Sequence, residues 1–338
     1  MYEDFFGLRE RPFDLTPNPR FLLLTPVHRR ALVNLEGGIA TRKGVVALIG
    51  EPGTGKTTIA RALMARRGQM TTFVYLNQSV ASPADLRRSL VQSFNLRPRG
   101  EASNTELVGD LTRRLAAYSQ RGGRVALAVD EAQTLPDDVL EEVRLLTNIE
   151  TNEGKLLTLL LIGQPKLAVR LNDPMWTQLK QRIEVRCTLT PLELSETAAY
   201  VWSRIQTAGG DAAQVFTADA IRLIHERSGG IPRSTSVIAE NALMAGFAEG
   251  ERPVTTRVVR QVCEELDWPA AEPAAAPPPP PSERTAAVAA TAAAHAAPVV
   301  TQAARPPQRD LPMDQNRPAR AAAPGRRWWF WSGAWTRS

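Results

Sequence analysis

A glycine-rich octapeptide between an apolar run and a helical pattern constrains the fold of this chain more than any other feature. Residues 45–49 are all apolar, which is the pattern of a buried strand, and residues 59–67 follow as a helix. Between them stands Gly50-Glu51-Pro52-Gly53-Thr54-Gly55-Lys56-Thr57, a full match to the phosphate-binding loop G-x-x-x-x-G-K-S/T. In this context the glycines let the backbone wrap around phosphate oxygens, and the helix adds the positive end of its dipole.

Further apolar runs extend this strand–loop–helix unit into a sheet. Buried strands are expected at 73–76, 125–129 and 156–162, and they alternate with helices that begin near Ser82, Thr105 and Asp137. Buried runs separated by helices predict a parallel sheet covered on both faces. The strands are expected to stop after Thr190-Pro191, and residues 191–268 give a pattern of four helices. The predicted fold class is α/β, with a sheet domain over 1–190 and an all-helical domain over 191–268.

The composition changes sharply after Trp268. Residues 269–338 contain 13 Pro and 21 Ala, a composition that buries too little apolar surface to offset the entropy of ordering. We expect 269–325 to be a disordered Pro/Ala-rich linker. The end, 326–338, holds four of the seven tryptophans. Its Arg326–Trp335 stretch is interpreted as a peripheral membrane or partner contact, or alternatively as a remnant without a role.

Charge and cysteine content bear on partners and location. The formal net charge is +6, of which the eight Arg and four acids of 269–338 account for +4, so residues 1–268 carry only +2 and give weak support to a nucleic-acid surface. Cys187 and Cys263 lack metal-ligand spacing, which predicts a reducing cytoplasm and neither a disulfide nor a zinc site. We expect neither a membrane span nor a secretory leader.

Two acidic residues follow the apolar run 125–129. Asp130 and Glu131 are therefore expected at the carboxyl edge of the sheet, where open α/β folds bind ligands. Together with the loop they predict a Mg²⁺-dependent ATP hydrolase. Lys56 would contact the β- and γ-phosphates, and Thr57 and Asp130 would hold Mg²⁺. Glu131 would orient or deprotonate the attacking water.

Three further polar residues are candidates, each with a structural alternative. Gln164 follows the run 156–162 and is predicted to touch the γ-phosphate or its water, unless it only begins a turn before Pro165. Arg182, expected between the last strand and the helical domain, would act as an arginine finger on a neighbouring subunit, or be a solvated surface residue. Arg233 opens a helix of the small domain and would reach back to the phosphates, or lie exposed in the first turn.

The sequence also resembles a known family over about residues 1–267. The motifs that carry the resemblance, besides the loop, are Met1-Tyr2, Phe5-Phe6-Gly7-Leu8, Pro12-Phe13, Thr16-Pro17-Asn18-Pro19-Arg20-Phe21-Leu22, His28-Arg29-Arg30-Ala31-Leu32, Val129-Asp130-Glu131-Ala132-Gln133, Arg144-Leu145-Leu146-Thr147-Asn148-Ile149-Glu150, Gly163-Gln164-Pro165, Gln181-Arg182-Ile183 and Ser228-Gly229-Gly230-Ile231-Pro232-Arg233. With this set the chain is similar to AAA+ ATPases of the ExeA/GspA kind. The family includes ATPases of type II secretion and short relatives near exopolysaccharide-export and exosortase (XrtA) genes.

The resemblance implies an AAA+ domain with a helical lid, ATP and Mg²⁺ as cofactors, and an amino-terminal block that helps to enclose the adenine. It also implies that Gln164 is sensor 1, Arg182 the finger region and Arg233 sensor 2. A finger acts in trans, so the resemblance implies a homo-oligomeric ring or arc. The residues expected to bind the nucleotide are Gly50, Glu51, Pro52, Gly53, Thr54, Gly55, Lys56, Thr57, Thr58 and Arg233.

The expected function is ATP-driven assembly or remodelling of a cell-envelope export system, either type II secretion-like or for exopolysaccharide. Its partners would be envelope-export proteins at the inner face of the cytoplasmic membrane. Secretion members continue with a membrane helix and a peptidoglycan-binding domain. We expect neither in this chain, and we therefore expect it to be nearer to the short members. The alternative is a DNA-associated helper ATPase of the transposition or replication-initiator type, with nucleic acid as the less favoured partner. A nucleotide switch with negligible turnover is the third hypothesis.

Overall fold

The computed structural model describes most of residues 1–268. The described ranges are 1–16, 19–21, 23–66, 70–76, 80–96, 104–152 and 154–268. The expected linker 269–325 and the Trp- and Arg-rich end 326–338 lie outside the described residues, so both remain predictions from the sequence.

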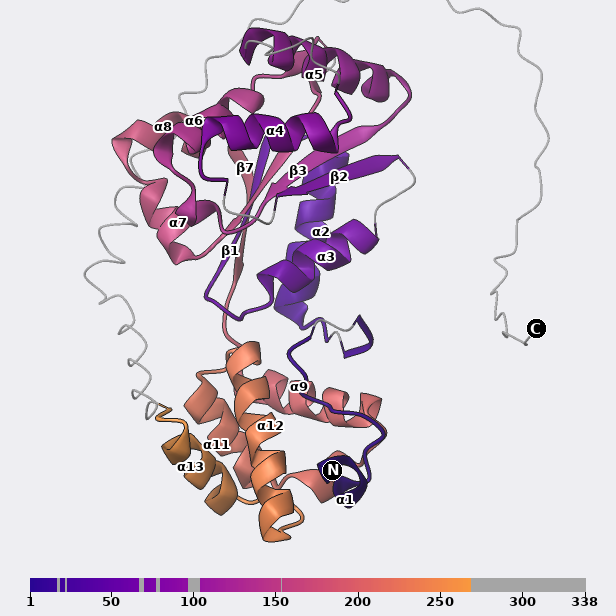
Figure 1. The fold of residues 1–338 in the computed structure, drawn as a ribbon, viewed down its shortest axis with the longest axis vertical. Helices are drawn as coiled ribbons and strands as arrows, with labels where there is room; N and C mark the ends of the chain where they lie inside the picture. The colour runs from indigo at the N-terminus through magenta and orange to yellow at the C-terminus, as the bar shows by residue number, and fades with distance from the viewer. Residues whose placement is uncertain are drawn as a thin grey trace, which may run out of the picture. The chain divides into compact units, whose positions relative to one another are not determined.

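A parallel sheet carries the residues predicted to form the site (Figure 1). Its five strands within the described ranges have the order β2-β3-β6-β1-β7, and every pairing is parallel. The bounds are β1 Val45–Gly50, β2 Thr71–Leu76, β3 Arg124–Val129, β6 Thr158–Gly163 and β7 Ile183–Leu189. All residues of β1 and β6 are buried, as continuous apolar runs predict for inner strands. The four expected strands are thus confirmed.

The strand β7 is not among the four expected strands, and Arg182, expected after the last strand, precedes it. In β7 the buried or half-buried residues Ile183, Val185, Cys187 and Leu189 alternate with the exposed residues Glu184, Arg186 and Thr188. The strand pairs only with β1, at the edge of the sheet. A strand with one solvent-exposed face alternates in this way. The sequence prediction rested on continuous apolar runs, which β7 does not have. A short ladder of β4 (Glu150–Thr151) and β5 (Gly154–Lys155) was also not expected.

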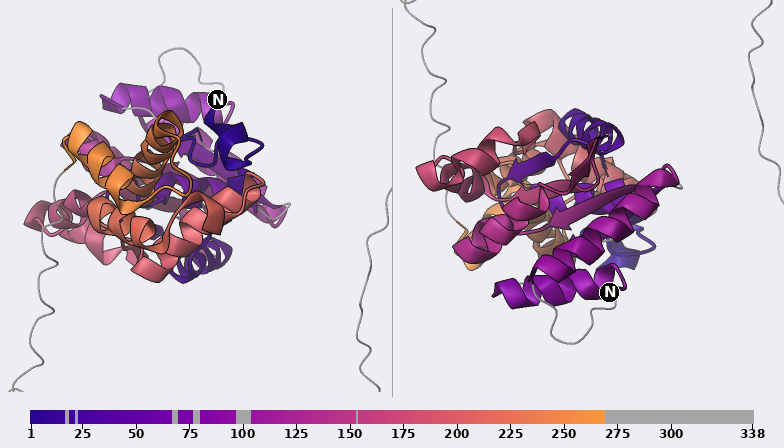
Figure 2. Two further views of the ribbon diagram at one scale, coloured as in Figure 1. Left: turned by 90° about the horizontal axis from the view of Figure 1, so that it is seen from below. Right: turned by 90° about the horizontal axis from the view of Figure 1, so that it is seen from above.

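Helices cover both faces of the sheet (Figure 2). On one face α2 (Pro26–Ala40) and α3 (Lys56–Ala65) pack against Ala126, Ala128, Leu160 and Ile162. On the other, α4 (Pro83–Ser93), α5 (Asn104–Gln120) and α6 (Asp137–Leu146) pack against Leu127, Val129, Leu159 and Leu161. Successive residues of β3 and β6 enter opposite clusters because side chains alternate along a strand. Two short helices, α7 (Pro165–Arg170) and α8 (Thr177–Gln181), lie between β6 and β7.

Residues 191–268, all of which the structure describes, are predominantly helical, and we refer to them as the lid. Its helices are α9 (Leu194–Thr207), α10 (Ala212–Val215), α11 (Ala218–Ser228), α12 (Pro232–Glu249) and α13 (Thr256–Glu265). Four of them correspond to the four expected helices, and α10 is an additional single turn. Gly229 ends α11 in the left-handed conformation that glycine favours. Within the described ranges, no helix combines the length and the apolar character needed to cross a membrane.

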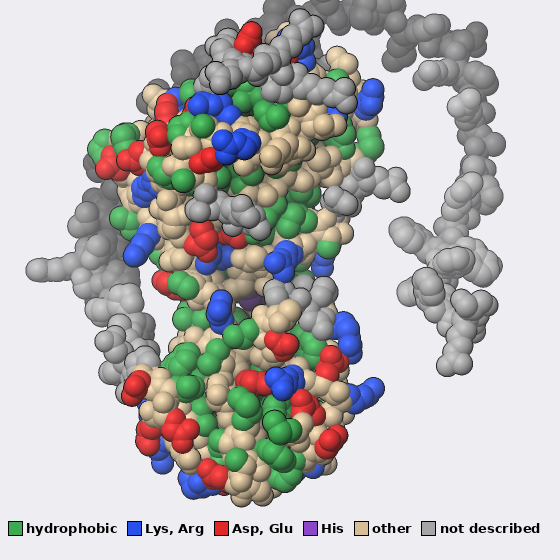
Figure 3. Space-filling view, viewed as in Figure 1, with side chains coloured by type: hydrophobic (Ala, Val, Ile, Leu, Met, Phe, Trp, Pro, Cys, Tyr) green, Lys and Arg blue, Asp and Glu red, His purple; other side chains and the backbone are tan. Residues whose placement is uncertain are grey.

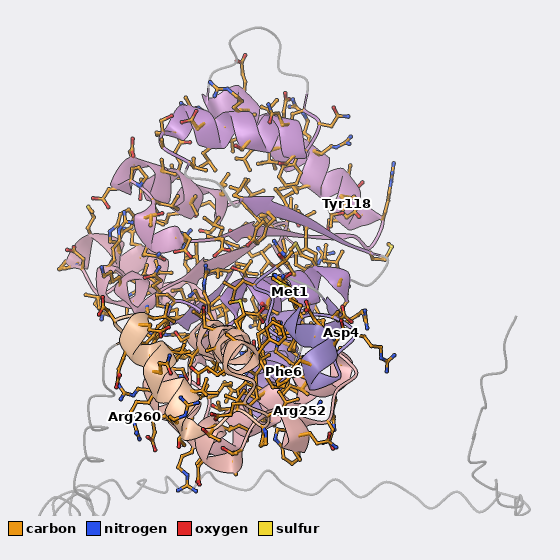
Figure 4. All side chains as sticks on the ribbon, turned by 60° about the horizontal axis from the view of Figure 1, so that its bottom comes forward. Met1, Asp4, Phe6, Tyr118, Arg252 and Arg260 are labelled. Atoms are coloured by element: carbon orange, nitrogen blue, oxygen red, sulfur yellow. The ribbon has the colours of Figure 1, made fainter. Side chains whose placement is uncertain are left out.

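The amino-terminal segment packs into the core of the lid. The helix α1 (Tyr2–Phe6) and the 3-10 turn η1 (Pro19–Phe21) supply aromatic side chains to the same buried cluster as α9, α11, α12 and α13. Figure 4 shows Phe6 among the lid helices and Arg252 close to α1, and Arg252 donates to the Phe5 carbonyl at 2.6 Å. The segment before α2 is thereby attached to the lid.

Arg204 of α9 holds the following part of this segment. Its guanidinium donates to the carbonyls of Pro12 and Asp14. It also lies over the rings of Phe13 and Phe21, 5.9 and 5.1 Å from the ring centroids. These contacts combine apolar burial with cation–π attraction, which fixes the segment on α9.

We expect Phe13→Ala to lower the free energy of unfolding by about 3–5 kcal/mol, the usual cost of emptying a buried aromatic site. The Phe13 side chain is 1% exposed in the lid cluster. Thermal unfolding of the full chain followed by circular dichroism measures the effect. Leu15→Ala is the matched control in the same segment, because Leu15 is 51% exposed. An equal loss of stability in both variants would contradict the packing role of Phe13.

Candidate functional site

Three polar segments meet at the carboxyl edge of the sheet. The glycine-rich loop follows β1, Asp130 and Glu131 follow β3, and Gln164 follows β6, the strand between β1 and β3. The register places Ile49 opposite Gly163 and Val129 opposite Leu161. Because these neighbouring parallel strands end at the same edge, the fold brings together predicted site residues from three distant parts of the sequence.

The loop after β1 has a backbone that glycine adopts easily. Gly53 and Gly55 have φ values of +83° and +97°. Thr54 is fully buried and closes the loop, since its N–H and its hydroxyl donate to the Glu51 carbonyl at 3.2 and 2.8 Å. The helix α3 begins directly afterwards at Lys56. The N–H groups of its first turn have no intrahelical acceptors and could receive an anion together with the loop.

Lys56 is folded against the base of this loop. Its side chain is 6% exposed, and Nζ donates to the carbonyls of Gly50 at 2.9 Å and Glu51 at 3.0 Å. Burial lowers the pKa of Lys56, and the charges of Glu131, Asp130 and Glu51 act in the opposite direction. The ammonium group is therefore held between the loop and the acidic pair, where a phosphate would meet it.

Asp130 accepts hydrogen bonds on both carboxylate oxygens. Thr57 Oγ1 donates to Oδ2 at 3.1 Å, the Tyr75 hydroxyl donates to the same oxygen, and the Glu131 N–H donates to Oδ1 at 2.9 Å. A hydroxyl and a carboxylate side by side are hard oxygen ligands, which fit Mg²⁺. Thr57 and Asp130, both predicted as metal ligands, thus lie within contact of each other.

Tyr75 is a site residue that the sequence analysis missed. Burial raises the pKa of its hydroxyl, and the hydrogen bond to Asp130 raises it further, so the group stays protonated and donates. It lies on β2, the neighbour of β3. The sequence feature that could have identified Tyr75 is its hydroxyl, which stands near the end of the strand that pairs with β3.

Glu131 is held by two amides. Its backbone φ is +51°, a conformation that is uncommon for residues other than glycine. Its Oε2 accepts from Gln164 Nε2 at 3.1 Å and from the Gln133 amide. Gln133 Oε1 in turn accepts from the Gln164 N–H at 3.0 Å. Gln133 therefore connects the predicted base to the predicted sensor, a role that the sequence analysis did not assign.

Gly163 makes this connection possible. A Cβ at Gly163 would lie 2.8 Å from Gln133 Oε1 and equally close to the Leu167 side chain. A side chain at position 163 would therefore displace the Gln133 amide or the Leu167 side chain.

The lid reaches the loop through its backbone. The Arg233 N–H donates to the Gly53 carbonyl at 3.3 Å. A Cβ at Gly53 would lie 2.9 Å from Arg233 Cβ and 2.9 Å from Ile231 Cγ2, so only glycine permits this approach. The Arg233 side chain itself is exposed, and its contact with phosphate stays a prediction. The same holds for the exposed residues Glu51, Pro52 and Thr58.

The side-chain hydrogen bond of Arg182 goes to Thr147 and not to the phosphate loop. It follows α8 as the C-cap residue, and its guanidinium donates to Thr147 Oγ1 after α6. The hydrogen bond from Lys155 lowers the pKa of Glu150, and the charge of Arg182 adds to this effect. Within one chain Arg182 therefore interacts with the α6–β4 region, and its action on a neighbouring subunit stays a prediction.

Comparisons with known proteins agree with this geometry. The AAA domain family matches residues 39–171. The General secretion pathway protein A of Aeromonas hydrophila is 42% identical over 255 residues, which cover 75% of this chain and 46% of the relative. The chain therefore spans about half the length of this curated relative.

Solved structures share the fold at low identity. Cdc6p of Pyrobaculum aerophilum superposes with a TM-score of 0.60 at 20% identity, covering 75% of this chain and 70% of that one. The ORC2 protein of Aeropyrum pernix, in ADPNP and ADP complexes, gives 0.56 at 18% identity over 77% and 72%. The Walker-type ATPase of Pyrococcus abyssi gives 0.53 at 17% over 75% and 76%. The sheet, the loop and the sequence likeness together make this chain an AAA ATPase of the ExeA/GspA-like kind.

Proposed function

We propose that this chain binds ATP with Mg²⁺ and hydrolyses it to assemble or remodel a secretion-type export system of the cell envelope. The observation that carries the proposal is the convergence at one sheet edge of Lys56, the Thr57–Asp130 pair and the Glu131–Gln164 pair. These are a phosphate-binding cation, a metal-binding pair and a base with an orienting amide, the three parts that phosphoryl transfer to water requires.

In the proposed reaction the loop N–H groups and Lys56 bind the β- and γ-phosphates. Mg²⁺ held by Thr57 and Asp130 would supply positive charge to the phosphate oxygens. Glu131 accepts a proton from the water that attacks the γ-phosphorus. The bond from that phosphorus to the β–γ bridging oxygen breaks, and ADP and phosphate leave. Gln164, which donates to Glu131 Oε2, orients the water next to the carboxylate.

The biological setting rests on sequence likeness. Identity of 42% to a general secretion pathway protein supports a role in an export system, with envelope-export proteins as partners. We extend the proposal to a homo-oligomer at the inner face of the cytoplasmic membrane. More specifically, we propose that the export system is one for exopolysaccharide.

The DNA-helper alternative has no specific support. Likeness to Cdc6p and ORC2 at 20% and 18% identity reflects the fold alone. On the face shown in Figure 3, the Lys and Arg side chains of the described residues are interspersed with Asp and Glu side chains. Affinity for nucleic acid depends on clustered positive charge, so we do not propose DNA binding.

We expect Glu131→Gln to bind ATP and to lose turnover by about 10²-fold or more, because the amide cannot accept the proton from water. Phosphate release measures turnover, and equilibrium titration with ATP measures binding. Lys56→Ala is the contrasting variant, expected to lose binding itself. Equal turnover by Glu131→Gln and the unchanged chain would refute the role of Glu131.

We expect Tyr75→Phe to raise the Mg²⁺ concentration for half-maximal turnover by about tenfold, the usual effect of removing a partner of a metal ligand. The substitution removes only the hydroxyl that donates to Asp130. Tyr118→Phe is the matched control, because the Tyr118 hydroxyl accepts from Thr72 at 2.7 Å, away from the acidic pair. The same Mg²⁺ dependence in both variants would show that Tyr75 does not orient Asp130.

We expect Arg182→Ala to lose turnover by about 10³-fold, the contribution of an arginine finger acting on a neighbouring subunit. Mixing it with Glu131→Gln should restore activity, since each mixed interface can combine an intact base with an intact finger. Arg186→Ala, at an exposed position of β7, is the control. If mixing restores nothing, Arg182 does not act in trans.

A further inference from the structure

His28 touches the phosphate loop from the side of α2. Its side chain is buried, 7% exposed, although it stands in the first turn of that helix. The ring nitrogen Nε2 lies 2.9 Å from the Thr54 carbonyl oxygen, and Nδ1 lies 2.9 Å from Thr25 Oγ1. Thr25 is the N-cap of α2 and also accepts from the His28 N–H. The imidazole therefore bridges the helix cap and the loop.

The hydrogen-bond partners of the His28 imidazole determine which ring nitrogen carries the hydrogen. A carbonyl oxygen only accepts, so Nε2 must carry the hydrogen and donate to Thr54. In the neutral ring Nδ1 then accepts from the Thr25 hydroxyl. Thr25 thus holds the ring in the tautomer and orientation that point its donor at the loop.

The bond from His28 fixes one peptide group of the loop. In a planar trans peptide the carbonyl and the following N–H point in opposite directions. With the Thr54 carbonyl held toward His28, the Gly55 N–H is directed away from α2. A Cβ at Gly55 would lie 3.2 Å from His28 Nε2. Glycine at this position therefore allows both the positive φ and the close approach of the imidazole.

The neighbouring carbonyl is held by the lid. Gly53 accepts from the Arg233 N–H at 3.3 Å, and Thr54, the next residue, accepts from His28. The segment that leads into His28 is attached to the lid by Arg204. Two consecutive carbonyls of the loop are therefore bonded, one by the lid itself and one by His28, whose preceding segment is attached to the lid.

We propose that His28 is a positioning residue for nucleotide binding. It orients the 54–55 peptide so that the Gly55 N–H faces the phosphate, and it couples the loop to the amino-terminal segment on the lid. This role rests on the proposed function. An apolar side chain of similar size would fill the space, yet it would leave the buried Thr54 carbonyl without its donor.

Two substitutions separate this role from simple packing. In His28→Gln the side-chain amide reaches about as far as imidazole Nε2 and can donate to Thr54. In His28→Asn it reaches only as far as Nδ1, next to Thr25. Titration of the full chain with a fluorescent ADP analogue should show about tenfold weaker binding for His28→Asn, from one lost hydrogen bond in the loop. For His28→Gln the loss should stay within about threefold.

Turnover gives a second readout. Because His28 does not touch the reacting atoms, the KM for ATP should rise in His28→Asn while kcat at saturation changes by less than about twofold. A fall in kcat at unchanged KM would overturn the positioning role. Melting curves without nucleotide show whether both variants are folded.

A pair at Thr25 covers the case in which His28→Asn does not fold. Thr25→Ser keeps the hydroxyl that orients the ring, whereas Thr25→Val removes it, and only the second should weaken ADP binding severalfold. Equal affinities within either pair would overturn the role of His28 alone. Failure of the unchanged chain to bind ADP would overturn the proposed function and this role with it.

Discussion

A glycine-rich loop can bind a phosphate only when its peptide groups are held in one orientation, and the rest of this structure depends on how that is achieved. The loop is continuous with β1 on one side and α3 on the other. His28 and the Arg233 N–H engage the carbonyls of Thr54 and Gly53. Preorganised N–H groups stabilise an anion without the cost of reorienting at the moment of binding. The contacts that fix the loop therefore extend into α2 and the lid.

The acidic pair is organised by the same means. Asp130 is oriented by hydroxyl groups from Thr57 and Tyr75, and Glu131 by the amides of Gln133 and Gln164. Two adjacent carboxylates would repel and move if they were unrestrained. Different donors give them different positions, one next to the predicted metal-binding hydroxyl and one next to the predicted sensor. The separate roles proposed for these adjacent acids thus rest on their different hydrogen-bond partners.

Local patterns in the sequence predicted a large part of this arrangement. The inner strands were predicted because a strand buried on both faces is apolar at almost every position, as in β1 and β6. The edge strand β7 was missed because only one of its faces is covered, so charged residues interrupt the run. Tyr75 and Gln133 were missed for another reason: each acts through a partner on a different segment, which a reading of neighbouring residues does not reveal.

The sequence by itself determined the loop, the strand–helix alternation and the position of the acids, since backbone conformation and burial are encoded over a few adjacent residues. Only the tertiary structure decided which side chains complete the site. His28 stands 26 residues before Thr54 and meets it because α2 packs on the face of the sheet that also carries α3. Arg233 meets Gly53 because the lid folds back on the loop. Such contacts depend on how whole elements pack, and no local pattern specifies that.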